Sequence, residues 1–316
     1  MSKKDFMWAN LVLLGSNMWT EEGNTKGREH RSNSCASPVL RFERDTWDKY
    51  MEYQRINGVN TIIIDIGEAM FYESHPELAV EGSFTHDQMR AEIAKLRAMG
   101  FEVVPKLNFS ATHDIWLKDY SRMLSTPIYY QVCKDIINEV CDVFKPKYFH
   151  IGMDEENAEL QRNFYFAAVR QGELWWHDLY YLVDCVEKNN VRAWIWADRI
   201  WSHPDEFVKK MPKSVLCSCW YYNGEFQNPQ GEDAMRLKGY EDLDKHGFDQ
   251  VPTGSNWGAR DNFVKLTKYC AEKFNPDLQL GMMQTAWERI TEPWMPQINH
   301  SVDMLREARE WYENRK

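Results

Sequence analysis

Short apolar runs rich in β-branched residues recur along the chain, each followed by a turn and a segment of helical periodicity. Strands that alternate with helices in this way form parallel sheets, because the helix carries the chain back to the starting edge. Eight such units over 316 residues predict a single α/β domain, 1–316, folded as a (β/α)8 TIM barrel, which takes about 250 residues before insertions. The expected strands lie within 6–15, 60–67, 101–109, 147–153, 191–197, 214–220, 248–255 and 278–287.

One polar segment, 16–44, interrupts this regular order directly after the first expected strand. Loops of that length are usually either functional or disordered. In a barrel, a loop that follows a strand lies over the C-terminal face, where active sites form. The segment is therefore either a lid over a ligand or a flexible insertion.

The expected helices have recognisable start signals. Thr85 with Gln88 three residues later forms a capping box, and Thr126 followed by Pro127 starts another helix. Apolar residues at helical spacing predict the buried side of the helix after Pro127. These residues are Ile128, Val132, Ile136, Val140 and Val143.

The charge balance excludes some classes of partner. The chain has 48 acidic and 38 basic residues, a formal net charge of -10, whereas nucleic acids and anionic membranes bind clustered positive charge. No stretch reaches the roughly 20 apolar residues of a membrane span. We expect neither nucleic acid nor membrane as a partner and, from net charge, a neutral or cationic substrate. The oligomeric state stays open.

The N-terminal stretch resembles a signal peptide in its two lysines and apolar run but lacks a small-x-small cleavage site. We interpret it as the first strand, which predicts a cytoplasmic protein; a periplasmic or secreted location stays open if an export signal was removed. The seven cysteines lack metal-ligand spacing, and we expect them to be reduced and buried.

Acids and tryptophans dominate the predicted C-terminal strand ends, which form the active face of a barrel. Carboxylates transfer protons and stabilise an oxocarbenium-like centre, and flat rings hold the apolar faces of a sugar. The mixture predicts acid-catalysed chemistry with an oligosaccharide or glycoconjugate as partner. The positions are Asn17, Trp19, Asp65, Glu68, Asn108, His113, Asp154, Glu155, Trp196, Asp198, Trp220, Tyr221, Trp257, Trp287 and Glu288.

The most informative motif is HIGMDEE, 150–156, in which two carboxylates follow a buried strand. Adjacent acids repel, so in a dry site at least one of them should have the raised pKa that a general acid needs. Alternatively, Asp154 caps a helix that begins near Glu156, with Glu155 solvated in its first turn. The residue types alone leave both interpretations open.

YFHIGMDEE resembles the strand-four motif of the family 20 glycoside hydrolases, the β-N-acetylhexosaminidases, in which His-Ile-Gly-x-Asp-Glu supplies the catalytic pair. Residues 84–113 are similar to that family's second helix and third strand, which lead to a catalytic-site His. WIWAD, CSCW and QTAWE fall where family members carry tryptophans that wall the sugar. The similarity covers about residues 60–290 in order.

The resemblance implies that Glu155 protonates the departing glycosidic oxygen while Asp154 orients the 2-acetamido group, whose oxygen is the nucleophile. It implies that His113 and Asp65 orient and tune Glu155. The alternative is that His113 is a loop histidine and that Asp65, at a strand end, binds a backbone amide. No metal or organic cofactor is implied. The expected substrate-binding residues are Trp196, Trp220, Tyr221, Trp257, Asp261, Trp287 and Glu288.

The seventh strand supports this mechanism independently. Barrel glycosidases with a protein nucleophile commonly place it at the end of strand seven, but QVPTGSNWG has no acid before Asp261. An enzyme without that carboxylate needs another nucleophile, and the acetamido group of the substrate provides one.

Several positions depart from the family pattern. No arginine follows strand one in LLGSNMWTEE, and Lys106 and Asn108 stand where acids are usual. The family's Trp-x-Glu spacing falls on Arg289, one residue after Glu288. These departures indicate a distant member with an altered substrate.

Two alternatives to this function remain. One is a glycosidase of other specificity in which Glu155 works with Asp198 or Glu288; a carboxyl separation of about 5 to 5.5 Å would favour a direct nucleophile and about 6.5 to 9.5 Å an inverting water. The other is a non-catalytic carbohydrate-binding barrel. Metal catalysis is weaker still, since the nine histidines show no His-x-His or His-Glu-x-x-His spacing.

Overall fold

The computed structural model describes residues 6–15, 20–24 and 35–315. Eight parallel strands form one sheet in the order β6-β5-β4-β3-β2-β1-β8-β7. Bridges between Cys217 and Gln250 and between Trp220 and Thr253 join its two edge strands, so the sheet closes into a barrel and the predicted fold is confirmed. The strands are β1 (Met7–Leu13), β2 (Thr61–Asp65), β3 (Glu102–Lys106), β4 (Tyr148–His150), β5 (Arg192–Trp196), β6 (Leu216–Ser218), β7 (Thr253–Ser255) and β8 (Gly281–Arg289).

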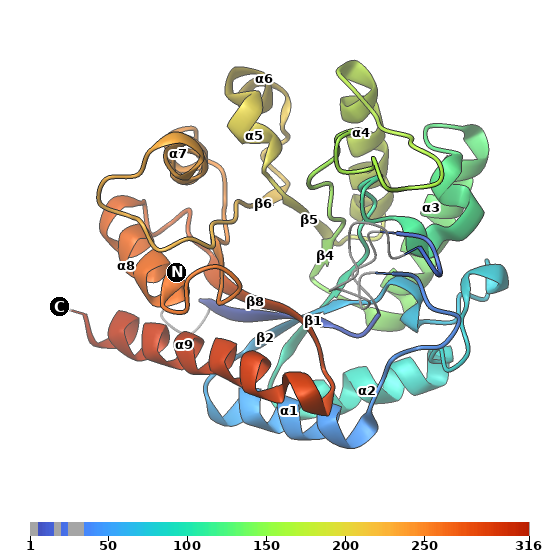
Figure 1. Cartoon of the computed structure of the whole chain (residues 1–316), viewed down its shortest axis with the longest axis horizontal. Helices are drawn as coiled ribbons and strands as arrows, with labels where there is room; N and C mark the ends of the chain where they lie inside the picture. Colours follow the sequence, from blue (N-terminus) through green and yellow to red (C-terminus); the bar gives the residue numbers. More distant parts are fainter. Residues whose placement is uncertain (1–5, 16–19, 25–34, 316) are drawn as a thin grey trace.

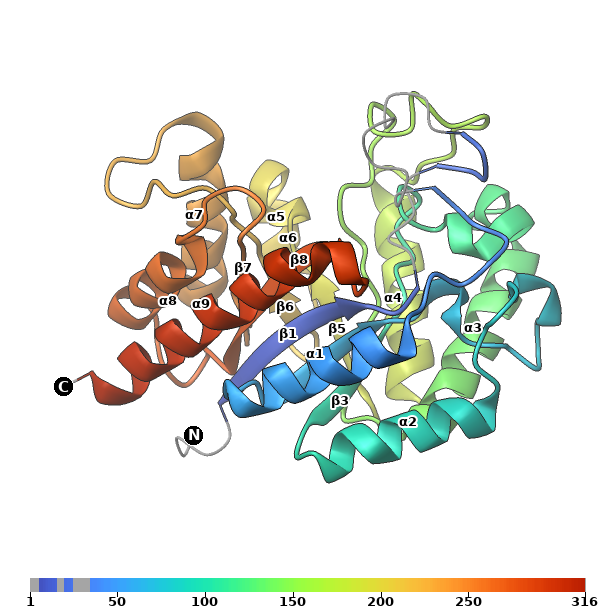
Figure 2. The ribbon, with the colours of Figure 1, turned by 60° about the horizontal axis from the view of Figure 1, so that its bottom comes forward.

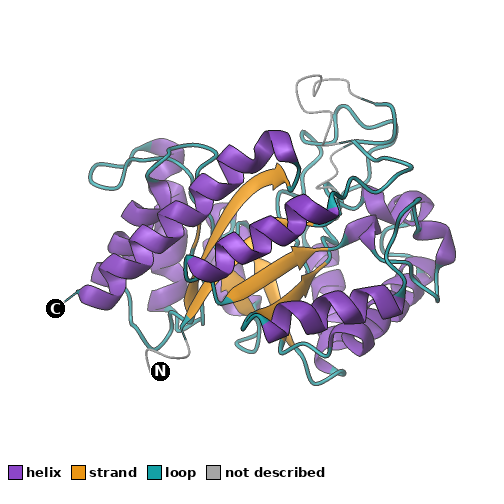
Figure 3. Ribbon diagram, turned by 90° about the horizontal axis from the view of Figure 1, so that it is seen from below, coloured by secondary structure: helices purple, strands orange, loops and turns teal. Residues whose placement is uncertain are grey.

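The helices surround the strands (Figure 1). Figure 2 shows α9, α1 and α2 outside strands β1 to β3, and the view from below in Figure 3 shows the strands enclosed by helices. The α-helices are α1 (Arg44–Ile56), α2 (His86–Ala98), α3 (Pro127–Phe144), α4 (Glu173–Glu187), α5 (Arg199–Ser202), α6 (Pro204–Lys210), α7 (Gly231–Lys245), α8 (Asn262–Lys273) and α9 (Met295–Asn314). Within the described residues, four 3-10 helices lie between them: η2 (Gly67–Ala69), η3 (Pro76–Leu78), η4 (Ile115–Arg122) and η5 (Glu292–Trp294).

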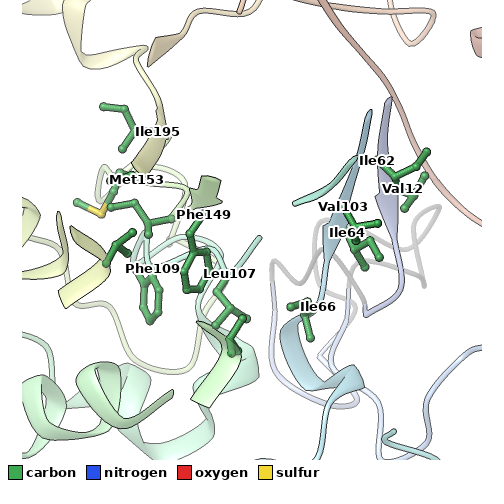
Figure 4. Packing of buried hydrophobic residues seen from close by; sticks show 14 of the residues in the cluster. Val12, Ile62, Ile64, Ile66, Val103, Leu107, Phe109, Phe149, Met153 and Ile195 are labelled. Carbon is green, nitrogen blue, oxygen red and sulfur yellow. The ribbon is translucent and has the colours of Figure 1, made fainter. Parts of the chain in front are cut away.

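Alternation along each strand divides the core into two layers, because successive side chains point to opposite faces. The outer layer, between strands and helices, includes Val12, Ile62, Ile64 and Val103, which gather from three neighbouring strands in Figure 4. The inner layer fills the barrel and contains, among others, Met7, Ala9, Leu11, Ile63, Val104, Trp194 and Met283. At the C-terminal ends of the strands, the side chains on this inner face therefore point into the barrel mouth.

The two predicted helix starts are confirmed, with one error in the buried side of α3. Thr85 and Gln88 form the capping box of α2, and the Thr126 side chain caps α3 ahead of Pro127. Ile128, however, is 57% exposed. The buried stripe begins at Tyr129 and continues through Val132, Ile136, Val140 and Val143, so the four-residue spacing was extended one turn too far.

Two further observations concern the cysteines and the membrane-spanning potential of the helices. All seven cysteines are free and buried, as predicted. Among the helices of the described chain, none has the length and apolar character needed to cross a bilayer.

Parts of the segment 16–44 are described, and they lie against loops on the C-terminal side of the barrel. The side chain of Asn24 donates to the carbonyl of Asn163 at 2.7 Å, and Glu21 pairs with Arg122. A cavity of about 420 Å³ lies between this segment, the loop after β2 and η4. Asn17 and Trp19 lie outside the described residues, and the role of the segment as a lid stays a prediction.

Candidate active site

A ring of residues in register marks the level at which the barrel becomes polar. Leu13, Asp65, Lys106, His150 and Trp194 pair across β1 to β5. The Lys106 ammonium lies 2.5 Å from the Asp65 carboxylate, and both side chains are buried. Burial and the charge of Lys106 hold the pKa of His150 well below its usual range. The floor of the mouth is thus an ion pair beside a neutral imidazole.

The chain directly after β4 adopts a strained path that turns two carboxylates toward the mouth. Gly152, Met153 and Glu155 have φ of 74°, 80° and 54°. A Cβ at Gly152 would clash with Asn108, so this position requires glycine. Left-handed φ at Met153 and Glu155 costs free energy, of order 1–3 kcal/mol each, and such strain clusters at functional sites.

Asp154, Glu155 and His113 form one interacting group. Nε2 of His113 lies 3.4 Å from Oδ2 of Asp154 and 3.3 Å from Oε2 of Glu155. The Asn108 amide donates to Oδ1 of Asp154 at 2.8 Å. Asp154 is buried, whereas the Glu155 side chain is 28% exposed. The sequence-predicted pair is therefore assembled with one carboxylate anchored and the other reaching toward solvent.

The pKa values of Asp154 and His113 are shifted in opposite directions. Burial alone would raise the pKa of Asp154, but the charge of His113, with help from Lys106 and Asn108, lowers it below the usual range. Burial opposes protonation of His113, yet Asp154 and then Glu155 raise its pKa to about 9. Asp154 therefore lacks the raised pKa that repulsion between adjacent acids predicts, because a histidinium offsets that repulsion.

The carboxyl with the raised pKa belongs instead to Asp198, directly after β5. Burial and the charge of Asp154 raise its pKa to about 8. Its Oδ2 accepts a hydrogen bond from the Glu155 backbone N–H at 3.0 Å, and within the described chain its buried Oδ1 has no hydrogen-bond partner. The sequence suggested Asp198 only as an alternative partner of Glu155; the contact made is with the backbone, and it holds Glu155 in its left-handed conformation.

The alternative in which Asp154 caps a helix near Glu156 is wrong. The next helix, α4, begins at Glu173, and Glu156 forms a buried ion pair with Arg170 at 2.5 Å. Arg170 also donates to the Phe109 carbonyl at 2.6 Å, which ties the loop after β4 to the end of β3. Sequence patterns did not reveal this pair, because thirteen residues of irregular chain lie between its members.

Aromatic side chains from β5, β8 and the chain after β6 gather beside the acid pair. The Trp287 indole donates to the Tyr222 hydroxyl at 3.0 Å, and Trp220 stacks on the Tyr222 ring at 5.1 Å. Trp196 lies 5.9 Å from Trp287 between ring centroids. The charges of Glu155 and Asp154 both act on Tyr222, so this aromatic group borders the acid pair.

One predicted substrate-binding residue faces the wrong way. Tyr221 is fully buried in the outer layer, and its hydroxyl donates to the Glu225 carbonyl at 2.7 Å. Trp220 and Tyr222 belong to the inner layer. Because side chains alternate, Trp220 and Tyr221 cannot both face the mouth, so strand periodicity could have identified Tyr222.

The remaining predicted site residues are more scattered. Trp257 is 50% exposed in the loop after β7, and Asp261 lies on the surface, 2.8 Å from Lys265. Glu288 follows a bulge in β8, where Trp287 has a φ of 52°. The predicted action of Asp65 on Glu155 stays a prediction, since the ion pair that Asp65 makes is with Lys106.

The same group could hold a metal ion. Ligand atoms of His113, Asp154 and Glu155 all lie within 4.8 Å of one another. A metal would first have to displace the proton that the two carboxylates hold on His113, because only a neutral imidazole binds a metal. The arrangement therefore suits proton transfer better than metal binding.

Comparison with known proteins gives a consistent fold. No protein-family model matches the chain. Lacto-N-biosidase from Bifidobacterium bifidum is 21% identical over 145 residues, which is 41% of this chain and 13% of that protein. A β-N-acetylhexosaminidase from Bacteroides fragilis aligns with 95% of this chain and 65% of its own at a TM-score of 0.65 and 14% identity.

Two further solved structures share the fold. An exo-β-N-acetylglucosaminidase of glycoside hydrolase family 20 from Vibrio harveyi, in complex with N-acetylglucosamine, has a TM-score of 0.61 at 13% identity over 94% of this chain and 54% of its own. Dispersin B has a TM-score of 0.56 at 12% identity over 93% and 98%. The predicted similarity to family 20 barrels is confirmed at the level of fold.

Proposed function

We propose that the chain is a glycoside hydrolase that cleaves β-linked N-acetylhexosaminides of an oligosaccharide or glycoconjugate by substrate-assisted, retaining catalysis and without a metal. The observation that carries the proposal is the buried, ionised Asp154 beside the more exposed Glu155, with His113 between them. Several solved structures of this fold are named β-N-acetylhexosaminidases, which supports the same class of substrate.

In the first step, Glu155 donates its proton to the glycosidic oxygen, and the bond between that oxygen and the anomeric carbon breaks. The acetamido oxygen of the same sugar attacks the anomeric carbon, which gives a cyclic oxazolinium ion. Asp154 accepts the acetamido N–H and stabilises the positive charge that develops there. Its lowered pKa keeps it ionised for this role.

In the second step, the carboxylate of Glu155 removes a proton from water, and the water oxygen attacks the anomeric carbon. The oxazolinium ring opens, which restores the acetamido group and gives a sugar with its original configuration. His113 holds both carboxylates in position throughout. Asp198 fixes the backbone that carries the acid.

The aromatic group supplies binding and orientation. The apolar faces of Trp196 and Trp287 suit the C–H face of a pyranose ring. The oxygen of Tyr222 accepts from the Trp287 indole, so the hydroxyl proton is available to an oxygen of the ligand. These contacts exclude water from the side of the sugar that faces the acid pair.

The test uses aryl β-glycosides with and without the 2-acetamido group, each assayed with and without a thiazoline mimic of the cyclic intermediate. We expect cleavage only of the acetamido substrates and strong inhibition by the thiazoline. Equal rates on both classes of substrate would favour a glycosidase in which another carboxylate acts. Tight sugar binding without any hydrolysis would instead indicate a carbohydrate-binding barrel.

A further inference from the structure

A short turn that ends at His113 lies against the backbone of the acid pair. The turn is closed by a hydrogen bond from the His113 N–H to the Ser110 carbonyl at 2.9 Å. The Ser110 hydroxyl donates to the backbone carbonyl of Asp154 at 2.5 Å. The Thr112 hydroxyl donates to the backbone carbonyl of Glu155 at 2.7 Å, and both hydroxyl residues are buried. The turn that brings His113 to the two carboxylates therefore also holds the backbone that carries them.

The protons of both hydroxyls are needed by the two backbone carbonyls. The oxygens of Ser110 and Thr112 lie 3.0 Å apart, so either of them could donate to the other. Because a hydroxyl carries a single proton, such a bond would take the donor away from one of the two carbonyls. The arrangement that satisfies both carbonyls commits both protons to the backbone of Asp154 and Glu155.

These contacts fix the two peptide planes that flank the Cα of Glu155. The plane before it is held at both ends, because Ser110 donates to its carbonyl and its N–H donates to Asp198 at 3.0 Å. The plane after it is held by Thr112 at its carbonyl. The φ and ψ of a residue are the rotations between its two flanking planes. The φ of Glu155, 54°, is therefore set by side chains from the turn after β3 and from the end of β5.

A glutamate in the left-handed region needs such support. The left-handed conformation brings the Cβ close to the following carbonyl oxygen, a cost that only glycine avoids. If Glu155 rotated into an ordinary conformation, its carboxyl would leave the position in which Oε2 lies 3.3 Å from Nε2 of His113. A displacement of about 1 Å in a reacting group can lower a rate by about 100-fold. The direction of the carboxyl thus depends on the hydroxyls that hold its backbone.

We infer that Ser110 and Thr112 are positioning residues for the general acid. Their hydroxyls hold the backbone of Glu155 in the conformation from which its carboxyl can protonate the departing oxygen. This role rests on the proposed function, in which Glu155 is that acid. Neither hydroxyl acts on the sugar, so both act through Glu155. Sequence patterns did not point to either residue, since serine and threonine are common in turns.

The kinetic test uses Thr112→Val and Ser110→Ala, which each remove one hydroxyl with little change in size, on aryl N-acetyl-β-glucosaminides. With a weakly acidic phenol, we expect each variant to lower kcat by about 10- to 100-fold and to change KM by less than about threefold. With 2,4-dinitrophenol, which departs without a proton, the loss in kcat should be less than about threefold. Thr112→Ser keeps the hydroxyl and should recover most of the rate. Equal losses for both phenols, or no loss for either, would overturn the inference.

A double-mutant cycle separates positioning of the acid from a general effect on stability. If Thr112 acts through the Glu155 carboxyl, Thr112→Val should lower kcat by less than about threefold in the Glu155→Gln background. A full loss in that background would show a structural role only. Ser121→Ala is the matched control, because this buried hydroxyl donates to the Lys118 carbonyl at 2.7 Å within η4. It should leave kcat unchanged with either phenol.

Crystal structures distinguish this inference from the proposed function, because they need no hydrolysis. In the variant that carries both Ser110→Ala and Thr112→Val, we expect the φ of Glu155 to leave the left-handed region and its carboxyl to move by more than about 1 Å. If the parent cleaves no glycoside but this shift occurs, the hydroxyls do position Glu155 and the hydrolase proposal fails. If acetamido substrates are cleaved but Glu155 keeps its conformation in the variant, the inference fails and the proposed function stands.

Discussion

Replacing Asp154 with Asn removes one charge from the centre of the site and leaves its shape intact. The Asn108 amide, 2.8 Å from Oδ1 of Asp154, can still donate to an amide oxygen there, so we expect a folded protein. In the proposed mechanism, the lost group is the buried, ionised carboxylate that stabilises the developing positive charge. Removing one preorganised electrostatic partner of this kind lowers kcat by about 10²- to 10³-fold, or about 2.7–4 kcal/mol.

The assay measures kcat on 4-nitrophenyl N-acetyl-β-glucosaminide together with the inhibition constant of the thiazoline mimic. Because catalysis depends on differential binding, the thiazoline should lose affinity by a factor similar to the loss in kcat, while N-acetylglucosamine binding changes by less than about tenfold. Asp184→Asn, on the exposed side of α4, serves as the control. A kcat within about tenfold of the parent, or unchanged thiazoline affinity, would refute the role of Asp154.

Two predictions concern stability. Burial raises the folded-state pKa of Asp198 to about 8, so the folded protein keeps a proton that the unfolded chain has already lost, and the free energy of unfolding falls as the pH rises to about 8. Asp198→Asn should therefore show a smaller fall in Tm between pH 6 and pH 9 than the parent. An equal fall would contradict the raised pKa. Arg170→Met leaves the buried Glu156 without its partner and should destabilise the fold by about 3–5 kcal/mol in urea denaturation; a change below about 1 kcal/mol would show that water reaches the pair.

The fold was predictable because each strand can be recognised from its own short stretch of sequence. Apolar β-branched runs such as TIIID in β2 and the capping box at Thr85 depend only on nearby residues. The error at Ile128 also comes from relying on local patterns, because apolar spacing does not show which turn of the helix first contacts the sheet. Eight repeats of a strong local pattern were enough to predict the closed barrel.

The clustering of three predicted residues could be foreseen from the sequence, but the electrostatics of the cluster could not. The motif at 150–156 and His113 do come together. The sequence could not place the raised pKa on Asp198, because that shift depends on burial and on the charge of Asp154 across two strands. Tyr222 was missed for a different reason: the alternation that identifies it was not applied at the end of β6.

The central claim is that Glu155 protonates the departing oxygen. Its most direct test is kcat/KM of Glu155→Gln on aryl N-acetyl-β-glucosaminides whose phenols differ in acidity, with Glu159→Gln in the same loop as control. We expect a loss of at least about 100-fold for a weakly acidic phenol and a much smaller loss for 2,4-dinitrophenol, which departs without a proton. Equal losses for both phenols, or no loss for either, would contradict it.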